Sequence, residues 1–181
     1  MDLFTRKKNR CPADPLSRQT GAGVTLLEML VAIVVIAILI AVIAPSYKAI
    51  RLQAEKAVCI SHMRVIHTGL DNHMLDKNRW PQMPKAVFDS KDETDFWKWW
   101  ILTLEPYGAG EPHWLCPSDK VRKDSADEYN SSYLPALFNS HHHTPYRWAK
   151  QPWLVERGNL HKRGAHIMLP DGSIHSSRDV F

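Results

Sequence analysis

Residues 24–44 read VTLLEMLVAIVVIAILIAVIA, and this stretch decides how the rest of the chain is organised. Thr25 and Glu28 are the polar members of an otherwise apolar run. A helix of this length spans about 30 Å, which matches the hydrocarbon core of a bilayer. A core helix in so short a chain would keep one polar face, whereas this run is apolar all round. We therefore predict a membrane-spanning helix.

A secretory signal peptide is the main alternative for this stretch, because a basic region precedes it. Signal peptides have an apolar region of about 7–15 residues, and the run in this chain is longer. Ala41-Val42-Ile43-Ala44, followed by Pro45, is also a poor cleavage site. The sequence therefore favours a helix that stays in the membrane.

The composition of the whole chain is that of an ordinary globular protein. Of its 181 residues, 44% are hydrophobic and 23% charged, which excludes wholesale disorder. With one long apolar run, a polytopic membrane protein is excluded as well. Residues 1–23 hold five Lys or Arg against two Asp, so they carry most of the formal net charge of +4. The rest is nearly neutral, and nucleic acid is an unlikely partner on this ground.

After Pro45 the apolar pattern becomes that of an amphipathic helix. Apolar residues recur at steps of three and four, which places them on one helix face: Cys59, Met63, Ile66, Leu70 and Met74. This stripe predicts a buried face under a globular part. Trp80-Pro81 predicts the end of the helix, so residues 45–79 continue the helix that begins in residues 24–44.

Residues 80–181 are predicted to form a compact head, and they contain all seven Trp residues. Residues 96–104, FWKWWILTL, predict a short helix that Pro106 ends. A platform of Trp rings for stacking carbohydrate is the functional alternative. We interpret these rings as core, since a small head has few other large apolar residues.

The chain closes with a predicted β-hairpin in residues 165–175. Asp171-Gly172 stands between two short apolar runs, which is typical of a tight primed turn with positive φ at its central residues. Pro170 has no N–H, so one strand should lie at a sheet edge or start late. The predicted fold class is α+β: a long N-terminal helix packed against a small C-terminal head with a short antiparallel β-sheet.

The segment Gly23-Val24-Thr25-Leu26-Leu27-Glu28, with a basic stretch before it and an apolar run after it, resembles the processing site of bacterial type IV prepilins and type II secretion pseudopilins. The resemblance implies cleavage by a prepilin peptidase between Gly23 and Val24, and N-methylation of Val24. It makes Glu28 the fifth mature residue, which pairs with a neighbouring subunit's amine during assembly. Pro45 falls where many pilins have a helix kink. The family usually has Phe in the place of Val24.

The same resemblance implies what the chain does. It would be a structural subunit, a pilin or pseudopilin, of a type IV pilus or a type II secretion pseudopilus. Residues 1–23 would be a cytoplasmic leader that is removed, and residues 24–44 a single-pass anchor in the bacterial inner membrane and the filament core. The head would be periplasmic. The implied partners are prepilin peptidase, other subunits and the secretion or pilus assembly machinery. The alternative is a minor, pilin-like anchored protein whose head binds carbohydrate or DNA.

A second resemblance covers the end of the chain. His161, followed by nine residues and then Asp171-Gly172, resembles the H-X9-DG element of a large subgroup of prepilin-type proteins. Ser173 departs from the subgroup, which often has His at that place. The subgroup's other features occur in the expected order at Cys59, at residues 97–100 and at residues 116–119.

The cysteines are predicted to form one bridge. Cys11 leaves with the leader, and the head lies outside the cytoplasm, where disulfides persist. Cys59 lies on the apolar stripe, and Cys116 precedes a Pro in a segment that can fold back onto it. We predict a Cys59–Cys116 disulfide. Two buried free thiols are the alternative, because Cys packs well as a small apolar residue.

We predict no enzymatic activity and no cofactor. The sequence contains no HExxH, CxxC pair, phosphate loop or Gly-x-Ser-x-Gly. Calcium is the metal that the resemblance suggests, since several major pseudopilins bind it in C-terminal loops. Asp119 and Asp171 are weak candidate ligands, because their spacing fits no known calcium loop.

Overall fold

The computed structural model describes residues 23–90, 92–141, 143–161 and 164–180. The chain divides into two compact units between Ile43 and Ala44. Helix α1, Leu26–Lys77, contributes its first part to one unit and its second part to the other. Most of the predicted leader, including Cys11, lies outside the described residues.

The described part of the first unit is the apolar end of α1. Its stretch Leu26–Ala44 is long and apolar enough to cross a membrane, by length and composition. Every residue from 23 to 44 is exposed.

The second unit is built on one face of the second part of α1. The predicted stripe is confirmed, since Cys59, Met63, Ile66, Leu70 and Met74 are all buried in the core of the head. The helix ends at Lys77, and Asn78 follows with a left-handed φ of 52°. Asn is one of the few residues that adopts this conformation at low cost, and it commonly ends helices.

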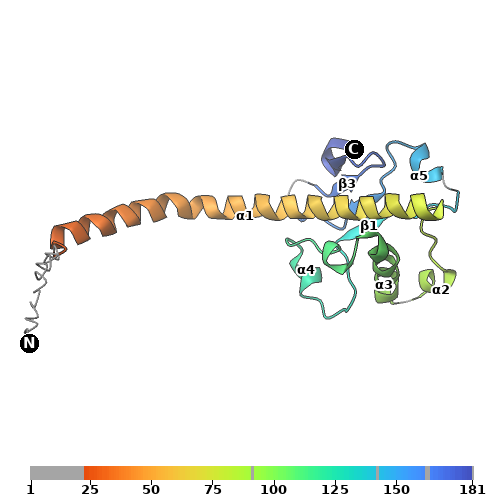
Figure 1. Cartoon of the computed structure of the whole chain (residues 1–181), viewed down its shortest axis with the longest axis horizontal. Helices are drawn as coiled ribbons and strands as arrows, with labels where there is room; N and C mark the ends of the chain where they lie inside the picture. Colours follow the sequence, from red (N-terminus) through yellow and green to blue (C-terminus); the bar gives the residue numbers. More distant parts are fainter. Residues whose placement is uncertain (1–22, 91, 142, 162–163, 181) are drawn as a thin grey trace, which may run out of the picture. The chain divides into compact units, whose positions relative to one another are not determined.

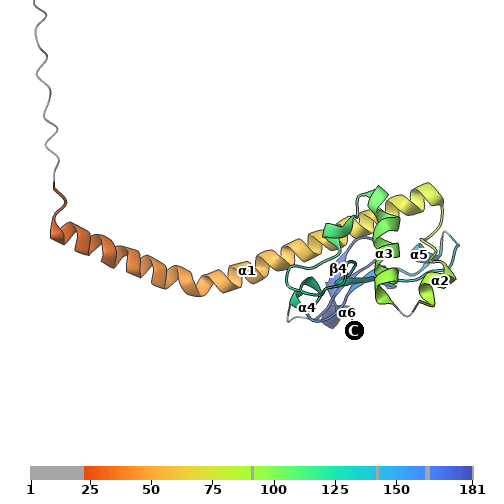
Figure 2. The same cartoon turned by 90° about the horizontal axis from the view of Figure 1, so that it is seen from below.

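The head elements gather along this part of α1 (Figure 1, Figure 2). In the view of Figure 1, α2, α3 and α4 lie below α1, and α5 lies above it. The short helices are α2 (Lys85–Phe88), α3 (Glu93–Leu104), η1 (Glu105–Tyr107), η2 (Glu111–His113), α4 (Lys120–Lys123), α5 (Thr144–Arg147) and α6 (Ser177–Val180).

Helix α3 is the predicted Trp-rich helix, and it begins three residues earlier than expected. The side chain of Asp92 accepts a hydrogen bond of 2.9 Å from the backbone N–H of Thr94 and so caps the helix. Trp97 and Trp100 are buried with the apolar side chains of the last turn. The interpretation of these rings as core is confirmed.

One four-stranded antiparallel sheet completes the head, and the predicted α+β fold class is confirmed. The strands are β1 (Tyr133–Pro135), β2 (Leu154–Glu156), β3 (His166–Met168) and β4 (Ile174–Ser176), in the order β1-β2-β3-β4. Ile167 pairs with Val155 of β2 and with His175 of β4. Strand β4 is an edge of the sheet, as the position of Pro170 suggested.

The closing hairpin exists, but its turn is not the tight primed turn that the sequence predicted. The N–H of Gly172 donates to the carbonyl of Leu169, and the N–H of Leu169 donates to the carbonyl of Ser173, both at 3.0 Å. In this turn, positive φ occurs at Gly172 and not at Asp171. The pattern is a type I turn followed by a glycine bulge. The proline ring explains the difference, because it fixes φ near −65° and so suits the first central position of a type I turn.

A close approach between α1 and the segment after η1 sets the position of the head. Gly69 is buried on α1, and a Cβ atom there would lie 2.9 Å from the Cβ of Ala109. Real Cβ atoms essentially never come so close. Packing therefore requires glycine at this position, although glycine has a poor helix propensity.

We predict that Gly69→Val lowers the free energy of unfolding by about 1–3 kcal/mol, because the added methyl groups overpack this contact. Urea denaturation followed by tryptophan fluorescence measures the effect. Thr68→Val is the control, since Thr68 is the exposed neighbour on the same helix and its replacement should cost less than about 0.5 kcal/mol. Equal stability of the two variants would contradict the close approach.

Candidate functional site

The start of α1 presents the predicted processing bond outside the helix. Gly23 and Val24 are exposed and precede the first helical residue, Leu26. The hydroxyl of Thr25 accepts a hydrogen bond of 3.2 Å from the backbone N–H of Glu28. A Thr that caps the third amide of a helix is the first half of a capping box, a signal that the sequence reasoning missed. The cap fixes where the helix begins, so the Gly23–Val24 bond stays in extended chain.

Glu28 lies in the first turn of α1 and is exposed. A negative charge is favourable there because the free amides of a helix N-terminus carry partial positive charge. The apolar side chains that follow it are exposed down to Ile43. An apolar surface of this extent marks contact with lipid or with other protein chains.

The predicted kink residue, Pro45, lies inside α1, which continues through it as one helix. Proline removes one hydrogen bond of the helix ladder and crowds the preceding turn. A kink at this position stays a prediction.

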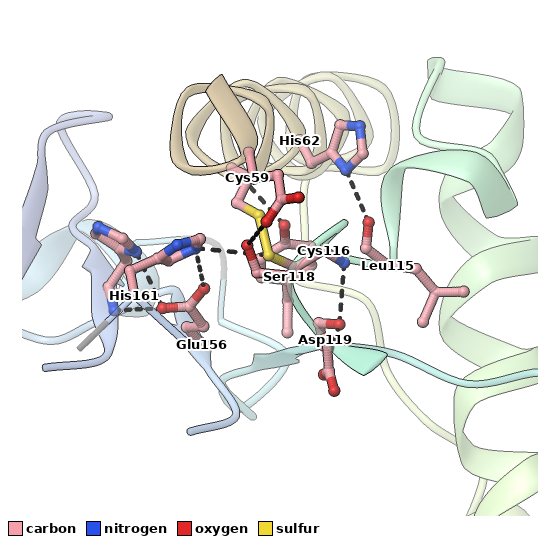
Figure 3. The surroundings of a disulfide bond; sticks show 12 residues. Cys59, His62, Leu115, Cys116, Ser118, Asp119, Glu156 and His161 are labelled. Atoms are coloured by element: carbon pink, nitrogen blue, oxygen red, sulfur yellow. Dashed lines mark hydrogen bonds and ion pairs between the residues drawn. A yellow bond between two sulfur atoms is a disulfide. The ribbon is translucent and has the colours of Figure 1, made fainter. Parts of the chain in front are cut away.

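The structure joins Cys59 and Cys116 by a disulfide, with their Cα atoms 5.1 Å apart and 57 positions apart in sequence (Figure 3). Both residues are fully buried. Cys59 belongs to the buried face of α1, and Cys116 lies in the segment between η2 and α4. The bond therefore attaches this segment of the head to the helix.

Two hydrogen bonds flank the disulfide and hold the same segment against α1. His62 donates from Nδ1 to the carbonyl of Leu115 at 3.0 Å, and the hydroxyl of Ser118 donates to the carboxylate of Glu55 at 2.8 Å. The Ser118 bond, aided by Arg51, lowers the pKa of Glu55. Figure 3 shows His62 and Leu115 on one side of the disulfide. The disulfide and these two hydrogen bonds thus hold the segment around Cys116 against α1.

The two weak calcium candidates are engaged in local structure and are not brought together in one cluster of the described residues. Asp119 is buried, pairs with Arg122 at 2.6 Å and accepts a hydrogen bond of 2.8 Å from the hydroxyl of Ser132. Asp171 accepts hydrogen bonds from the amide and the hydroxyl of Ser173, which lower its pKa. Each carboxylate therefore has a structural partner.

His161 lies against the disulfide and beside a buried carboxylate. Its Nε2 is 3.2 Å from Oε1 of Glu156 and 3.5 Å from the sulfur of Cys116. The other oxygen of Glu156 accepts hydrogen bonds from the backbone N–H and from Nδ1 of His166, at 3.0 and 2.9 Å. Burial lowers the pKa of His161, while the charge of Glu156 acts in the opposite direction. Sequence reasoning missed Glu156 and did not connect His166 to it, because nothing in their spacing marks them as partners.

The closing turn also touches α1. Nε2 of His67 donates to the carbonyl of Pro170 at 3.1 Å, and a Cβ on Gly172 would lie 3.6 Å from the His67 ring. The same ring stacks on Trp153 with centroids 4.9 Å apart. Both ends of the segment from His161 to Gly172 therefore contact residues at the α1 interface.

Comparison with known proteins agrees with this arrangement. The family model for the prokaryotic N-terminal methylation motif matches residues 19–44. The type II secretion system core protein G of Aeromonas hydrophila is 30% identical over 118 residues, which cover 65% of this chain and 74% of that protein. The core protein G of Klebsiella michiganensis is 32% identical over 72 residues, 40% of this chain and 51% of that protein. No solved structure matches the chain.

The chain belongs to the pilin and pseudopilin family. The matched family model covers the start of α1. The Aeromonas match is longer than the leader and α1 together, so it includes part of the head. The methylation motif thus covers the start of α1, and the similarity to core protein G extends into the head.

We predict that the double variant Cys59→Ser/Cys116→Ser loses about 2–4 kcal/mol of unfolding free energy, because the bridge restricts the unfolded chain. Urea denaturation followed by tryptophan fluorescence measures the loss, and Ser61→Ala, an exposed change on the same helix, serves as the control. Alkylation without reduction, followed by mass spectrometry, should leave both cysteines unmodified in the wild-type protein. Two alkylated cysteines per mature chain would rule out the bridge.

Proposed function

We propose that this chain is a structural subunit of a type II secretion pseudopilus, anchored in the inner membrane and polymerising through residues 24–44. The observation that carries the proposal is the capped, fully exposed apolar start of α1, with Glu28 in its first turn. The methylation motif and the similarity to two core G proteins support it. The similarity favours a pseudopilus over a pilus, and no comparison favours a minor subunit that binds carbohydrate or DNA.

The chemistry of assembly follows from the cost of isolated charge in an apolar environment. Cleavage after Gly23 would create a positive amine at Val24, four residues before the carboxylate of Glu28. Once subunits pack their apolar helices together, each of these charges is far from water. A buried charge is tolerated when it is paired, so the carboxylate of one subunit would neutralise the amine of the next.

The proposed topology is a single pass with the leader in the cytoplasm and the head in the periplasm. Five Lys or Arg residues in the leader agree with a cytoplasmic location. The Cys59–Cys116 disulfide agrees with an oxidising location for the head. The proposed partners are prepilin peptidase, other pseudopilins and the secretion machinery. The proposal includes no catalytic step and no cofactor.

We predict that the membrane-extracted protein begins at Val24 and carries one added methyl group. Intact-mass measurement should show the loss of residues 1–23, because the exposed Gly23–Val24 bond lies ahead of the helix. Gly23→Val should prevent the loss, whereas Gly21→Val, two positions from the bond, should be processed. A mature protein that begins at Met1, or after Ala44, would refute the assignment.

We predict that Glu28→Ala inserts into the membrane normally but assembles poorly. An unpaired buried amine costs about 3–5 kcal/mol, so incorporation should fall more than tenfold. Crosslinking of subunits in membranes, followed by gel analysis, measures incorporation. Glu28→Gln should fail similarly, since it keeps the shape and loses the charge. Met29→Ala, the exposed neighbouring position, is the control. Normal incorporation of Glu28→Gln would remove the charge-pairing role.

A further inference from the structure

Four potential metal ligands from separate parts of the head meet at the disulfide. Cys59 comes from α1, Cys116 from the segment before α4, Glu156 from the end of β2 and His161 from the loop after it. One donor atom from each side chain lies within 4.8 Å of all the others. Figure 3 shows the His161 ring between the Glu156 carboxylate and the disulfide. All four side chains are almost completely buried.

A proton or a metal cation must lie between the carboxylate of Glu156 and the imidazole of His161. Oε1 of Glu156 and Nε2 of His161 are 3.2 Å apart. The carboxylate oxygen has lone pairs, and Nε2 has one whenever the imidazole proton is on Nδ1. Oε1 is fully buried and, His161 aside, has no hydrogen-bond partner among the described residues. Two buried lone pairs at this distance repel unless a proton or a metal cation lies between them. In the disulfide form, the proton of the neutral imidazole on Nε2 fills this place.

We propose that Cys59, Cys116, Glu156 and His161 form a zinc site when the disulfide is reduced. A dithiol supplies two electrons, so the S–S bond breaks, two thiols form in this chain and the dithiol becomes a disulfide. Zinc then replaces the two thiol protons, which are released. The imidazole proton moves to Nδ1, which frees Nε2 to bind the metal. The proposal goes beyond the pseudopilin role and does not rest on it.

The donor set is suited to zinc. Zinc binds thiolate sulfur at about 2.3 Å and imidazole nitrogen or carboxylate oxygen at about 2.0–2.2 Å, in tetrahedral geometry. At these bond lengths the sulfur atoms lie about 3.8 Å apart, and the other donors are closer together. The observed cluster, within 4.8 Å, needs the sulfur atoms to separate by side-chain rotation. Thiolates favour zinc over calcium or magnesium, which prefer oxygen ligands.

Surrounding hydrogen bonds already orient the ligands. His166 holds Oε2 of Glu156 through two hydrogen bonds, which leaves Oε1 directed at His161. The hydroxyl of Ser132 accepts a hydrogen bond of 3.0 Å from the amide of Cys116. Such outer contacts are what fixes the ligands of protein metal sites. Zinc would thus join the same parts of the head that the disulfide joins.

Cobalt(II) is a suitable probe of this site, added to the full chain in detergent after reduction with a phosphine. The chain carries Cys11→Ser, so that its two remaining cysteines are those of the site. The phosphine takes an oxygen atom from water and leaves two thiols. We expect one cobalt per chain, with a thiolate-to-cobalt charge-transfer band, the strong visible bands of four-coordinate cobalt, and displacement by zinc. The oxidised chain is the matched control, because it has the same histidines without thiolates. It should show no charge-transfer band.

The neutral ligands separate this site from a simple pair of thiols. His161→Gln and Glu156→Gln should each weaken cobalt binding more than about tenfold, since the loss of even a residue that only orients a metal ligand typically costs at least that much affinity. His175→Gln, an exposed histidine of β4, should leave the affinity unchanged. If the reduced chain unfolds without metal, zinc should restore its circular dichroism, and the His161→Gln chain should not recover.

Two results would overturn the proposal. The first is a reduced wild-type chain that shows no thiolate-to-cobalt band and gains no structure on addition of zinc. The second is a cobalt affinity that stays the same in His161→Gln and Glu156→Gln, since the thiols alone would then hold the metal.

Discussion

The buried face of α1 is the surface on which the whole head depends. Cys59, Met63 and Ile66 are completely inaccessible to solvent, and the large rings of Trp80, Trp100 and Trp153 share one core with them. A head of about 100 residues is held together mainly by the apolar area that it buries, and here much of that area lies against this face. The disulfide and its flanking hydrogen bonds add further links at the point where the head meets the helix.

In the first turn of α1, the backbone amide and the side-chain carboxylate of Glu28 have separate roles. The amide of Glu28 is satisfied by the Thr25 hydroxyl, which belongs to the helix start itself. The carboxylate of Glu28 remains exposed to the surroundings of the helix. Helix initiation and the proposed charge pairing between subunits therefore use different atoms of the same residue, and substitution of the side chain leaves the cap in place.

The sequence predicted those parts of the fold that have long or distinctive patterns. The stripe on α1 repeats over several turns, and the Trp-rich helix α3 is bounded by a proline, so both were predicted. All four strands have three residues, too few to show alternation. Strands β3 and β4 were predicted because Asp171-Gly172 marks the turn between them, whereas β1 and β2 have no such turn signal and were missed. The hairpin turn was assigned the wrong type because Asp171-Gly172 outweighed Pro170 in the interpretation. The contact of Glu156 with His161 and His166 depends on the path of the loop between β2 and β3, which no sequence pattern predicts.

The contact of His67 with Pro170 also constrains when the head can fold. These residues are 103 positions apart, so the turn that covers this part of α1 is synthesised well after the helix itself. Until then, Met63, Ile66 and Leu70 have an incomplete cover on a nascent chain that emerges N-terminus first. Contacts so distant in sequence slow folding, and exposed apolar surface favours aggregation in the meantime. Completion of the head therefore waits for the segment that holds Pro170, and until that segment packs, the apolar face of α1 keeps an exposed part.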